Sequence, residues 1–312
     1  MLIASLALAL LQAPVPSASA TQTLATVPAT VPWAVQFDLP SKITGRTYRI
    51  YVARPIGAPP KGGWPVVYVL DGDMAFPSLA AQNVLHSVGG GGGAIVVGVA
   101  YPNAIATMTL RNRDLTPSQP SPASNSIGDF AKPRAEDFGG ADDFYRFMTE
   151  ELRPRIATAY PTDPAAQTLM GYSLGGLFTL HVLFHHPDAY RTYVAGSPSI
   201  WWNDREVLKT EAAFSDAVRS GKVAPRVLIT SDAWEQDPPE AGLPPAGPER
   251  DSAVKALAAA RMVDNARDLA ARLKALPGGL GYVVHYVLFP EETHETGIPA
   301  ASSRGFTFAT SP

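Results

Sequence analysis

Apolar, β-branched runs recur along the chain, and stretches with helical spacing separate them. Continuous apolar runs predict strands that are buried on both faces, because a half-exposed strand alternates apolar and polar residues. Alternation of such strands with helices is typical of a mostly parallel sheet with helices on both faces, so we assign the chain to the α/β class. The predicted strands are 47–54, 64–70, 94–101, 168–172, 192–197, 226–231 and 282–289, the first of them a candidate for an antiparallel edge.

Apolar residues three and four positions apart predict helices between these strands. Pro154 lies inside one such stretch and predicts a kink or a break there, because proline lacks the donor that a helix needs. The stretch 252–276 is rich in alanine and ends at Pro277, which favours one long helix. The predicted helices are 76–86, 142–160, 174–186, 205–220 and 252–276.

Two segments, 102–139 and 232–250, are rich in proline and predict long loops. Loops of this length in a compact domain are often lids or binding loops, and the alternative is a plain surface insertion. The sequence shows no internal repeat and no clean linker. We therefore expect one α/β domain from residue 35 to residue 312.

The first twenty residues read MLIASLALALLQAPVPSASA and resemble a secretory signal peptide, with an apolar run at 2–11 and small residues at 17–20. They predict an exported protein, periplasmic or secreted; the alternative is a disordered start, since no lysine or arginine precedes the apolar run. The run is too short to span a bilayer, so we expect no membrane insertion of the mature form. We expect residues 21–34 to form an unstructured lead-in, a segment without helix or strand before the domain.

Composition narrows the classes of partner and chemistry. The chain has 312 residues, of which 46% are hydrophobic and 17% charged, enough for a sizeable core. A net charge of −3 without a basic run argues against a nucleic-acid partner. The chain has no cysteine, which excludes disulfides, thiolate catalysis and cysteine-ligated metals. The sequence leaves the oligomeric state unknown.

Residues 171–175 read GYSLG and match the pattern G-x-S-x-G, with a predicted strand before it and a predicted helix after it. In that context the glycines let strand and helix approach, and the serine hydroxyl projects from a sharp turn. We predict that Ser173 is a nucleophile and that the backbone N–H of Leu174 is an oxyanion donor. The alternative is an ordinary turn that Ser173 caps.

A nucleophilic serine needs a base, and the chain offers six histidines. His294 follows the last predicted strand, at the edge of a parallel sheet where active sites open, so we predict that it is the general base. The alternative interpretation is that His294 is a solvated loop residue without a catalytic role. His181 and His185 have helical metal-ligand spacing, but no H-E-x-x-H pattern accompanies them, and we expect no metal.

The acid should precede the histidine in the chain and follow the strand 226–231. Glu235 is the preferred residue and Asp232 the alternative, with Asp237 a third candidate. The carboxylate would hold the imidazole in one tautomer and stabilise its charged form. A Ser–His pair without a dedicated acid is also compatible with the sequence.

Further residues are candidates for the walls of the site. The predicted strand 64–70 runs into Asp71-Gly72-Asp73, and the N–H of Asp73 is a candidate for the second oxyanion donor, unless the segment is a plain Asp-Gly turn. Trp201 and Trp202 are adjacent and cannot both enter one core, so at least one should line a cleft. Arg111 and Arg113 suit an anionic group of a substrate, or a surface ion pair with Asp114.

The chain resembles the esterase-D-like branch of the α/β-hydrolases, and within it the siderophore esterases that open trilactones of the enterobactin or bacillibactin type. The resemblance implies an α/β-hydrolase fold and ester hydrolysis at a Ser173–His294 site, with a carboxylate near Glu235 and with the N–H groups of Leu174 and Asp73 as oxyanion donors. The proline-rich loop 232–250 is longer than this resemblance leads one to expect. The resemblance rests on segments 66–76, 96–102, 111–117, 147–163, 170–202 and 289–309.

The sequence thus predicts a serine esterase that acts on a small-molecule ester and needs no cofactor. One alternative is an acyltransferase on the same fold, in which an acceptor alcohol replaces water. Another is a binding module that kept the fold without catalysis, and a peptidase is a third. Fold alone does not separate these activities.

Overall fold

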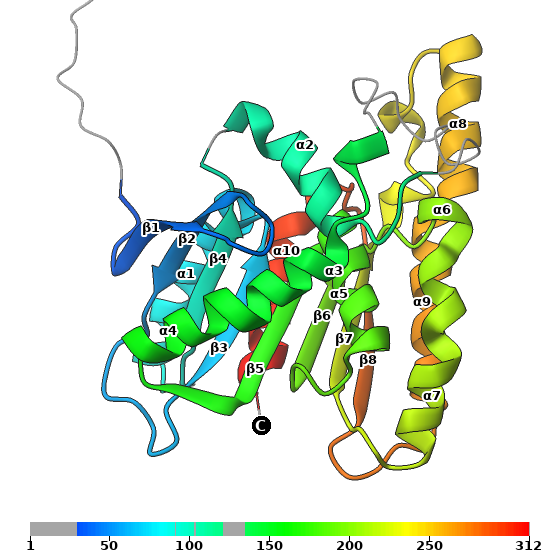
Figure 1. Cartoon of the computed structure of the whole chain (residues 1–312). Helices are drawn as coiled ribbons and strands as arrows, with labels where there is room; N and C mark the ends of the chain where they lie inside the picture. Colours follow the sequence, from blue (N-terminus) through cyan, green and yellow to red (C-terminus); the bar gives the residue numbers. More distant parts are fainter. Residues whose placement is uncertain (1–29, 91, 103, 121–134, 312) are drawn as a thin grey trace, which may run out of the picture. The chain divides into compact units, whose positions relative to one another are not determined.

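An eight-stranded sheet forms the centre of the described part of the chain, which is residues 30–90, 92–102, 104–120 and 135–311 (Figure 1). The spatial order is β1-β2-β4-β3-β5-β6-β7-β8. β2 pairs antiparallel with β1 and β4, and every other pairing is parallel. The strands are β1 Ala34–Pro40, β2 Thr47–Ala53, β3 Trp64–Leu70, β4 Ile95–Ala100, β5 Thr162–Tyr172, β6 Thr192–Gly196, β7 Arg226–Asp232 and β8 Val283–Phe289.

All seven predicted strands are present, and β1 is an additional strand that the pattern did not predict. The prediction of 47–54 as an edge is therefore wrong, because β1 pairs with β2 from the outer side. β1 has no fully buried residue, so its sequence lacks the apolar run that marks the other strands. Ala34, which we expected in the lead-in, belongs to β1. The predicted signal peptide lies outside the described residues.

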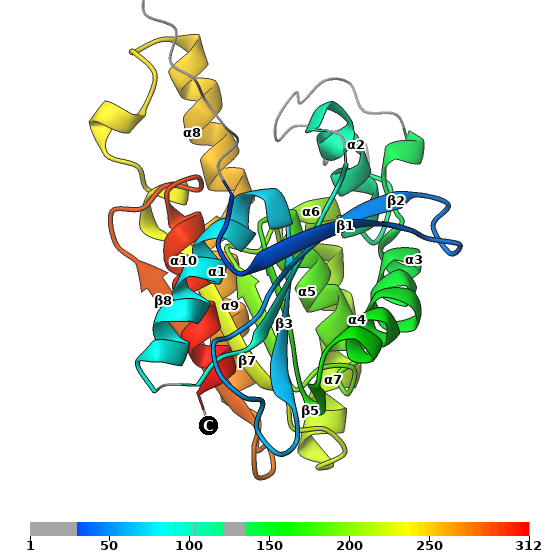
Figure 2. The same cartoon turned by 90° about the vertical axis from the view of Figure 1, so that its left-hand side faces the viewer.

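Helices cover both faces of the sheet. α1 and α10 lie on one side, and α3, α4 and α5 lie on the other (Figure 2). The α-helices are α1 Gly72–Val88, α2 Ala104–Leu115, α3 Ala141–Arg146, α4 Arg153–Ala159, α5 Leu174–His185, α6 Trp202–Arg205, α7 Glu211–Arg219, α8 Pro248–Ala260, α9 Met262–Lys274 and α10 Gly297–Thr310. Shorter helical segments are η2 Ala135–Asp137, η3 Phe147–Leu152, η4 Glu206–Thr210, η5 Ala233–Glu235 and η6 Glu240–Gly242.

The core consists of two layers, one on each face of the sheet. Tyr68 and Leu169 point into the layer that contains Phe178 of α5, whereas their neighbours Val67 and Met170 point into the layer of α1 and α10. Full burial of a large apolar side chain stabilises the fold by about 1.5–3 kcal/mol. Burial on both faces explains why the strands read as continuous apolar runs.

The helical path continues through Pro154, where the sequence predicted a kink or a break. The π-helical segment η3 lies directly before α4, and Pro154 is in the first turn of α4. The hydrogen-bond pattern changes from π to α at this junction, and a proline is tolerated in a helix where the regular pattern is interrupted. The wider turn of η3 lets the chain stay helical from Ala141 to Ala159.

The single helix predicted at 252–276 is wrong, because the chain forms two helices that meet at Arg261. Arg261 has φ 47° and ψ 43°, which ends α8 and begins α9. The side-chain amide of Asn265 donates to the carbonyl of Ala260 at 3.0 Å and so satisfies an acceptor that the break exposes. α9 packs on β7 and β8, whereas α8 extends away from the sheet (Figure 1).

The two predicted loops also contain regular structure. The segment 102–139 includes α2, which carries Arg111 and Arg113, and the segment 232–250 includes η5, η6 and the start of α8. From Val31 onward the chain forms one unit by its internal contacts. Within the described residues, no helix combines the length and apolar character that crossing a membrane requires.

Candidate active site

Ser173 lies on a sharp turn between β5 and α5, with φ 60° and ψ −120°. This conformation is rare for a residue with a side chain, and it persists only where the surroundings enforce it. Here the Ser173 N–H donates to the carbonyl of Gly196 at 2.9 Å, and the Ser173 carbonyl accepts from the N–H of Ser199 at 3.1 Å. The turn holds the hydroxyl at the carboxyl edge of the sheet.

Two of the glycines around Ser173, Gly171 and Gly176, leave no room for a side chain. A Cβ atom at Gly171 would lie 2.2 Å from the carbonyl oxygen of Gly175. One at Gly176 would lie 2.7 Å from the carbonyl oxygen of Gly196. Both atoms belong to backbone, which cannot move aside easily. The close approach of strand and helix that we predicted from the sequence is thus present.

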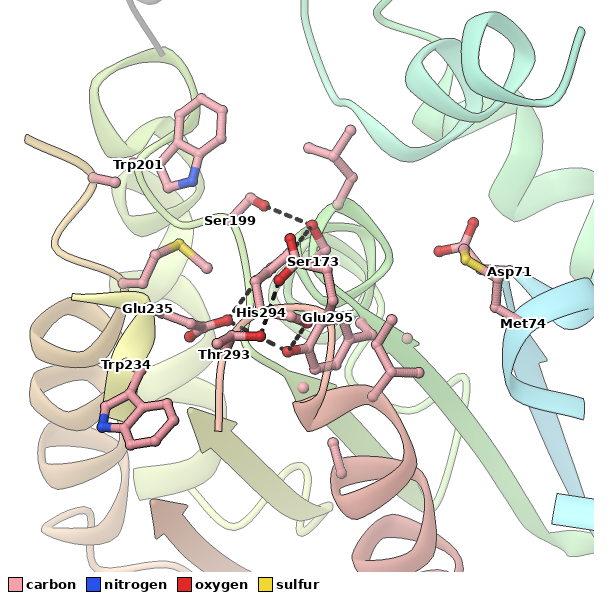
Figure 3. A pocket seen from close by; sticks show the side chains of 18 of the residues that line it. Asp71, Met74, Ser173, Ser199, Trp201, Trp234, Glu235, Thr293, His294 and Glu295 are labelled. Atoms are coloured by element: carbon pink, nitrogen blue, oxygen red, sulfur yellow. Dashed lines mark hydrogen bonds and ion pairs between the residues drawn. The ribbon is translucent and has the colours of Figure 1, made fainter. Parts of the chain in front are cut away.

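The structure brings Ser173, His294 and Glu235 together. His294 Nε2 lies 2.9 Å from Ser173 Oγ, and His294 Nδ1 is hydrogen-bonded to Glu235 Oε1 (Figure 3). The side chain of Glu235 is only 1% exposed, and that of His294 is 37% exposed. A hydroxyl, an imidazole and a buried carboxylate in this order can generate a nucleophile and stabilise the protonated imidazole.

Asp232, the alternative acid, lies beside Glu235 and does not contact the imidazole. Its Oδ2 atom lies 2.5 Å from the hydroxyl of Tyr172 and 2.6 Å from that of Ser197. Ser197 Oγ also lies 2.9 Å from Glu235 Oε2, so one hydroxyl bridges the two carboxyl groups. Burial raises the pKa of Asp232 to about 6, and the charge of Glu235 acts in the same direction. A protonated Asp232 lets the Ser197 hydroxyl donate to Glu235.

Leu174 and Asp73, the predicted oxyanion donors, each lie in the first turn of a helix. N–H groups in a first turn have no carbonyl partner within their own helix and are available to an anion. Leu174 begins α5 and lines the cavity described below. Asp73 is the second residue of α1, and its neighbours Asp71 and Met74 line the same cavity.

A cavity of about 1300 Å³ opens above Ser173 and His294. Trp201 and Trp234 lie to one side of Ser173 and Met74 to the other (Figure 3). Trp202 also lines it, so both members of the predicted tryptophan pair do. The sequence analysis missed Trp234, although its place directly after β7 was a signal. Further apolar lining residues are Phe138, Leu243, Leu257, Met262 and Ile298.

The two arginines that we considered for substrate binding have partners within the protein. Arg111 lines the cavity, but it forms a buried ion pair with Asp71, not with Asp114. Arg113 is outside the cavity lining and donates to the carbonyls of Glu136 and Phe138 at 2.8 and 3.3 Å. Asp114 pairs with Arg46 at 2.8 Å.

The histidines with metal-ligand spacing, His181 and His185, have other partners, and within the described residues no group of three or more His, Asp or Glu side chains could hold a metal ion. His181 Nε2 lies 2.8 Å from Asp142 Oδ1, which accounts for one member of the pair. His185 Nδ1 lies 2.9 Å from the carbonyl of His181.

Comparison with known proteins identifies the family to which the chain belongs. A family model described as "Putative esterase" matches residues 41–240. The chain belongs to this esterase family. It is 33% identical over 288 residues to the ferri-bacillibactin esterase BesA of Bacillus subtilis, covering 91% of both chains. It is 31% identical over 293 residues to the siderophore triacetylfusarinine C esterase of Aspergillus fumigatus, covering 90% of this chain and 94% of the relative.

Solved structures agree with this assignment. The BES protein from Bacillus cereus is 29% identical, with a TM-score of 0.77, and the match covers 93% of this chain and 100% of that one. The esterase described here therefore has the α/β-hydrolase fold, and it is a carboxylic ester hydrolase related to siderophore esterases.

Proposed function

We propose that Ser173, His294 and Glu235 are a catalytic triad and that this esterase hydrolyses siderophore esters. The observation that carries the proposal is the continuous chain of contacts from Ser173 Oγ through the imidazole of His294 to Glu235, at the floor of the large cavity. A nucleophile, a base and an orienting acid in hydrogen-bonding reach are the signature of acyl transfer through a serine.

In the proposed reaction, His294 Nε2 takes the proton of Ser173 as Oγ attacks the ester carbonyl carbon. The N–H groups of Leu174 and Asp73 stabilise the oxyanion of the tetrahedral intermediate. The C–O bond to the alcohol then breaks, and the alcohol leaves with the proton from His294. Water attacks the acyl-enzyme by the same steps in reverse. Glu235 accepts the Nδ1–H bond throughout and balances the charge of the imidazolium.

The size and the walls of the cavity support a bulky substrate. Pockets for drug-sized molecules are about 300–1,000 Å³, and this cavity is about 1300 Å³. Three tryptophans among its lining residues offer flat apolar surface to a large ester. The relatives BesA and the triacetylfusarinine C esterase are, by name, esterases of siderophores. A small-molecule siderophore ester fits these features.

We also propose that residues 1–20 direct export and are then removed, leaving a protein that is periplasmic or secreted and not inserted in a membrane. The apolar run followed by small residues supports this proposal. Sequencing the amino terminus of the protein recovered from its native cells tests it. We expect the mature chain to begin near Thr21, and an intact Met1 on all of the protein would contradict export by cleavage.

The nucleophile is tested with Ser173→Ala in the purified protein. We expect kcat on siderophore esters to fall by about 10⁴–10⁶, because serine and histidine act as one unit. Labelling by a fluorophosphonate should disappear, because the probe bonds to the serine oxygen. Ser199→Ala is the matched control, since Ser199 Oγ lies 3.5 Å from Ser173 Oγ and both residues line the cavity. The control should still be labelled. Activity at the unsubstituted level in Ser173→Ala would refute the mechanism.

The acid is tested by comparing two isosteric substitutions, Glu235→Gln and Asp232→Asn. We expect Glu235→Gln to lower kcat by about 10²–10⁴, because the amide no longer balances the charged imidazole. Asp232→Asn should lower kcat by less than about 10-fold, because Asp232 does not touch His294. The reverse order of effects would make Asp232 the acid.

A further inference from the structure

A single guanidinium joins the two loops from which the proposed oxyanion donors come. Arg111 of α2 donates from Nε to Asp71 Oδ1 at 2.7 Å and from Nη2 to Asp71 Oδ2 at 3.0 Å. Nη2 also donates to the carbonyl oxygen of Tyr172 at 3.4 Å. The side chains of Arg111 and Asp71 are 9% and 7% exposed. This is a buried, bidentate clamp of the kind that fixes geometry.

The clamp meets each loop at an equivalent place. Asp71 precedes Asp73 by two residues, and Tyr172 precedes Leu174 by two residues. A rotation at either clamped residue would therefore redirect the N–H group that follows it. The planar fork of an arginine can contact both loops at fixed angles, whereas the ammonium of a lysine cannot.

The conformation of Asp71 shows why its loop needs support. Asp71 has φ 51° and ψ 50°, a left-handed conformation that is unfavourable for a residue with a side chain. Its carbonyl accepts from the N–H groups of Met74 and Ala75 at 3.0 and 3.1 Å, so Asp71 sets the direction of the first turn of α1. On the other side the loop presses on β4, since a Cβ at Gly72 would lie 2.9 Å from the carbonyl carbon of Gly98.

We propose that Arg111 is a positioning residue that holds the N–H groups of Asp73 and Leu174 at the correct separation for one oxyanion. The inference rests on the proposed triad mechanism and adds a role for a residue that takes no part in proton transfer or in making and breaking bonds. It explains why a cation that lines the cavity has its charge matched by Asp71 and is not left for a substrate. Donors shifted by about 1 Å lose much of their effect on the transition state.

The test replaces Arg111 by methionine, which is similar in length and uncharged. We expect kcat to fall about 10²-fold with KM within about threefold, since only transition-state binding is lost. The affinity for an alkylboronic acid should fall by the same factor as kcat/KM, because its tetrahedral adduct with Ser173 places an oxygen between the two donors. Arg111→Lys should keep part of the activity, and Asp71→Asn should show the same pattern if Arg111→Met fails to fold.

Arg46→Met is the matched control, because Arg46 pairs with Asp114, which lies on the same helix α2 and outside the cavity lining. It should lower thermal stability and leave kcat within about threefold. Equal loss of kcat in Arg46→Met and Arg111→Met would assign the effect to α2 as a whole and overturn the inference. So would an unchanged boronic acid affinity in Arg111→Met. Activity in Ser173→Ala would instead refute the triad. The failure of the inference about Arg111 and the failure of the proposed function are therefore distinguishable.

Discussion

Two carboxyl groups share one buried corner of the site, and only one of them reaches the imidazole. Asp232 and Glu235 are both buried, and the hydroxyl of Ser197 lies within hydrogen-bonding distance of each. Two ionised carboxyl groups that share one hydroxyl repel each other, so one of the two carboxyl groups retains its proton to a higher pH. Asp232 is that group, with its pKa raised to about 6 by burial and by the charge of Glu235.

This pKa predicts a pH dependence of stability with a definite sign. The pKa of Asp232 is about 6 in the folded protein and 3.8 for an ordinary aspartate, so the folded state binds the proton more tightly. The resulting stabilisation is complete below about pH 4 and is lost as the pH rises through about 6. We expect the free energy of unfolding of the unsubstituted protein, relative to Asp232→Asn, to decrease between pH 4 and pH 7.

Urea unfolding at several pH values measures this difference. Asparagine cannot ionise, so the variant reports every other titration in the protein. A difference that stays constant over this range would show that Asp232 has an ordinary pKa. A difference that increases with pH would show that the folded state favours the ionised form.

At the residue scale, the sequence pointed to Ser173 and His294 because a motif and a chain order mark them. Their catalytic roles stay a prediction, although the structure places Oγ and Nε2 2.9 Å apart. The choice between Glu235 and Asp232 was ambiguous, because Asp232 is the last residue of β7 and Glu235 follows it by three positions. The pairing of Arg111 with Asp71 could not be read at all, since 40 positions separate them and only the fold brings them together.

At the scale of elements, the crossing of β5 and α5 depends on one missing side chain. We expect Gly171→Ala to destabilise the fold by about 3 kcal/mol or more, because its Cβ would collide with the backbone of Gly175. Gly175→Ala is the matched control, since the nearest atoms to its Cβ lie at 3.5 Å, an ordinary contact. Thermal unfolding of both variants measures the effect. Equal stability of the two would show that the strand and the helix can separate.

The elements that the sequence did not predict share a physical cause. β1 pairs with β2 at the edge of the sheet and buries its side chains only partly, so its sequence lacks a continuous apolar run. At the break, the side chain of Asn265 reaches back and donates to the carbonyl of Ala260. Both features are set by contacts between positions, and a pattern of single residues does not record them.

At the scale of the whole molecule, the cavity is built by segments that are far apart in the chain. Met74 follows β3, Trp201 follows β6, Trp234 follows β7, and Leu257 belongs to α8. The parallel sheet brings the first three together, because the carboxyl ends of its strands share one edge. The wall from α8 comes from outside the sheet.

This architecture predicts that a substitution in the cavity wall can weaken the binding of a bulky ester without slowing the hydrolysis of a short one. We expect Trp201→Ala to raise KM for a bulky siderophore ester about 10-fold, because it removes a large apolar contact worth about 1.4 kcal/mol or more. Hydrolysis of a short acetyl ester should change by less than about threefold. Trp33→Ala serves as the control, since Trp33 is 60% exposed and outside the cavity lining. Equal losses on both esters would mean that Trp201 supports the triad itself.

The joint at Arg261 has a consequence for how such an enzyme can diversify. Between η5 and this joint, the chain from Gln236 to Ala260 forms η6 and α8 and supplies Pro238, Leu243 and Leu257 to the cavity lining. Replacing this stretch by that of a relative would change one wall of the cavity and leave the proposed triad unchanged. Because this stretch contains no residue of the proposed triad, changes within it should alter which esters fit the cavity while Ser173, His294 and Glu235 stay in place.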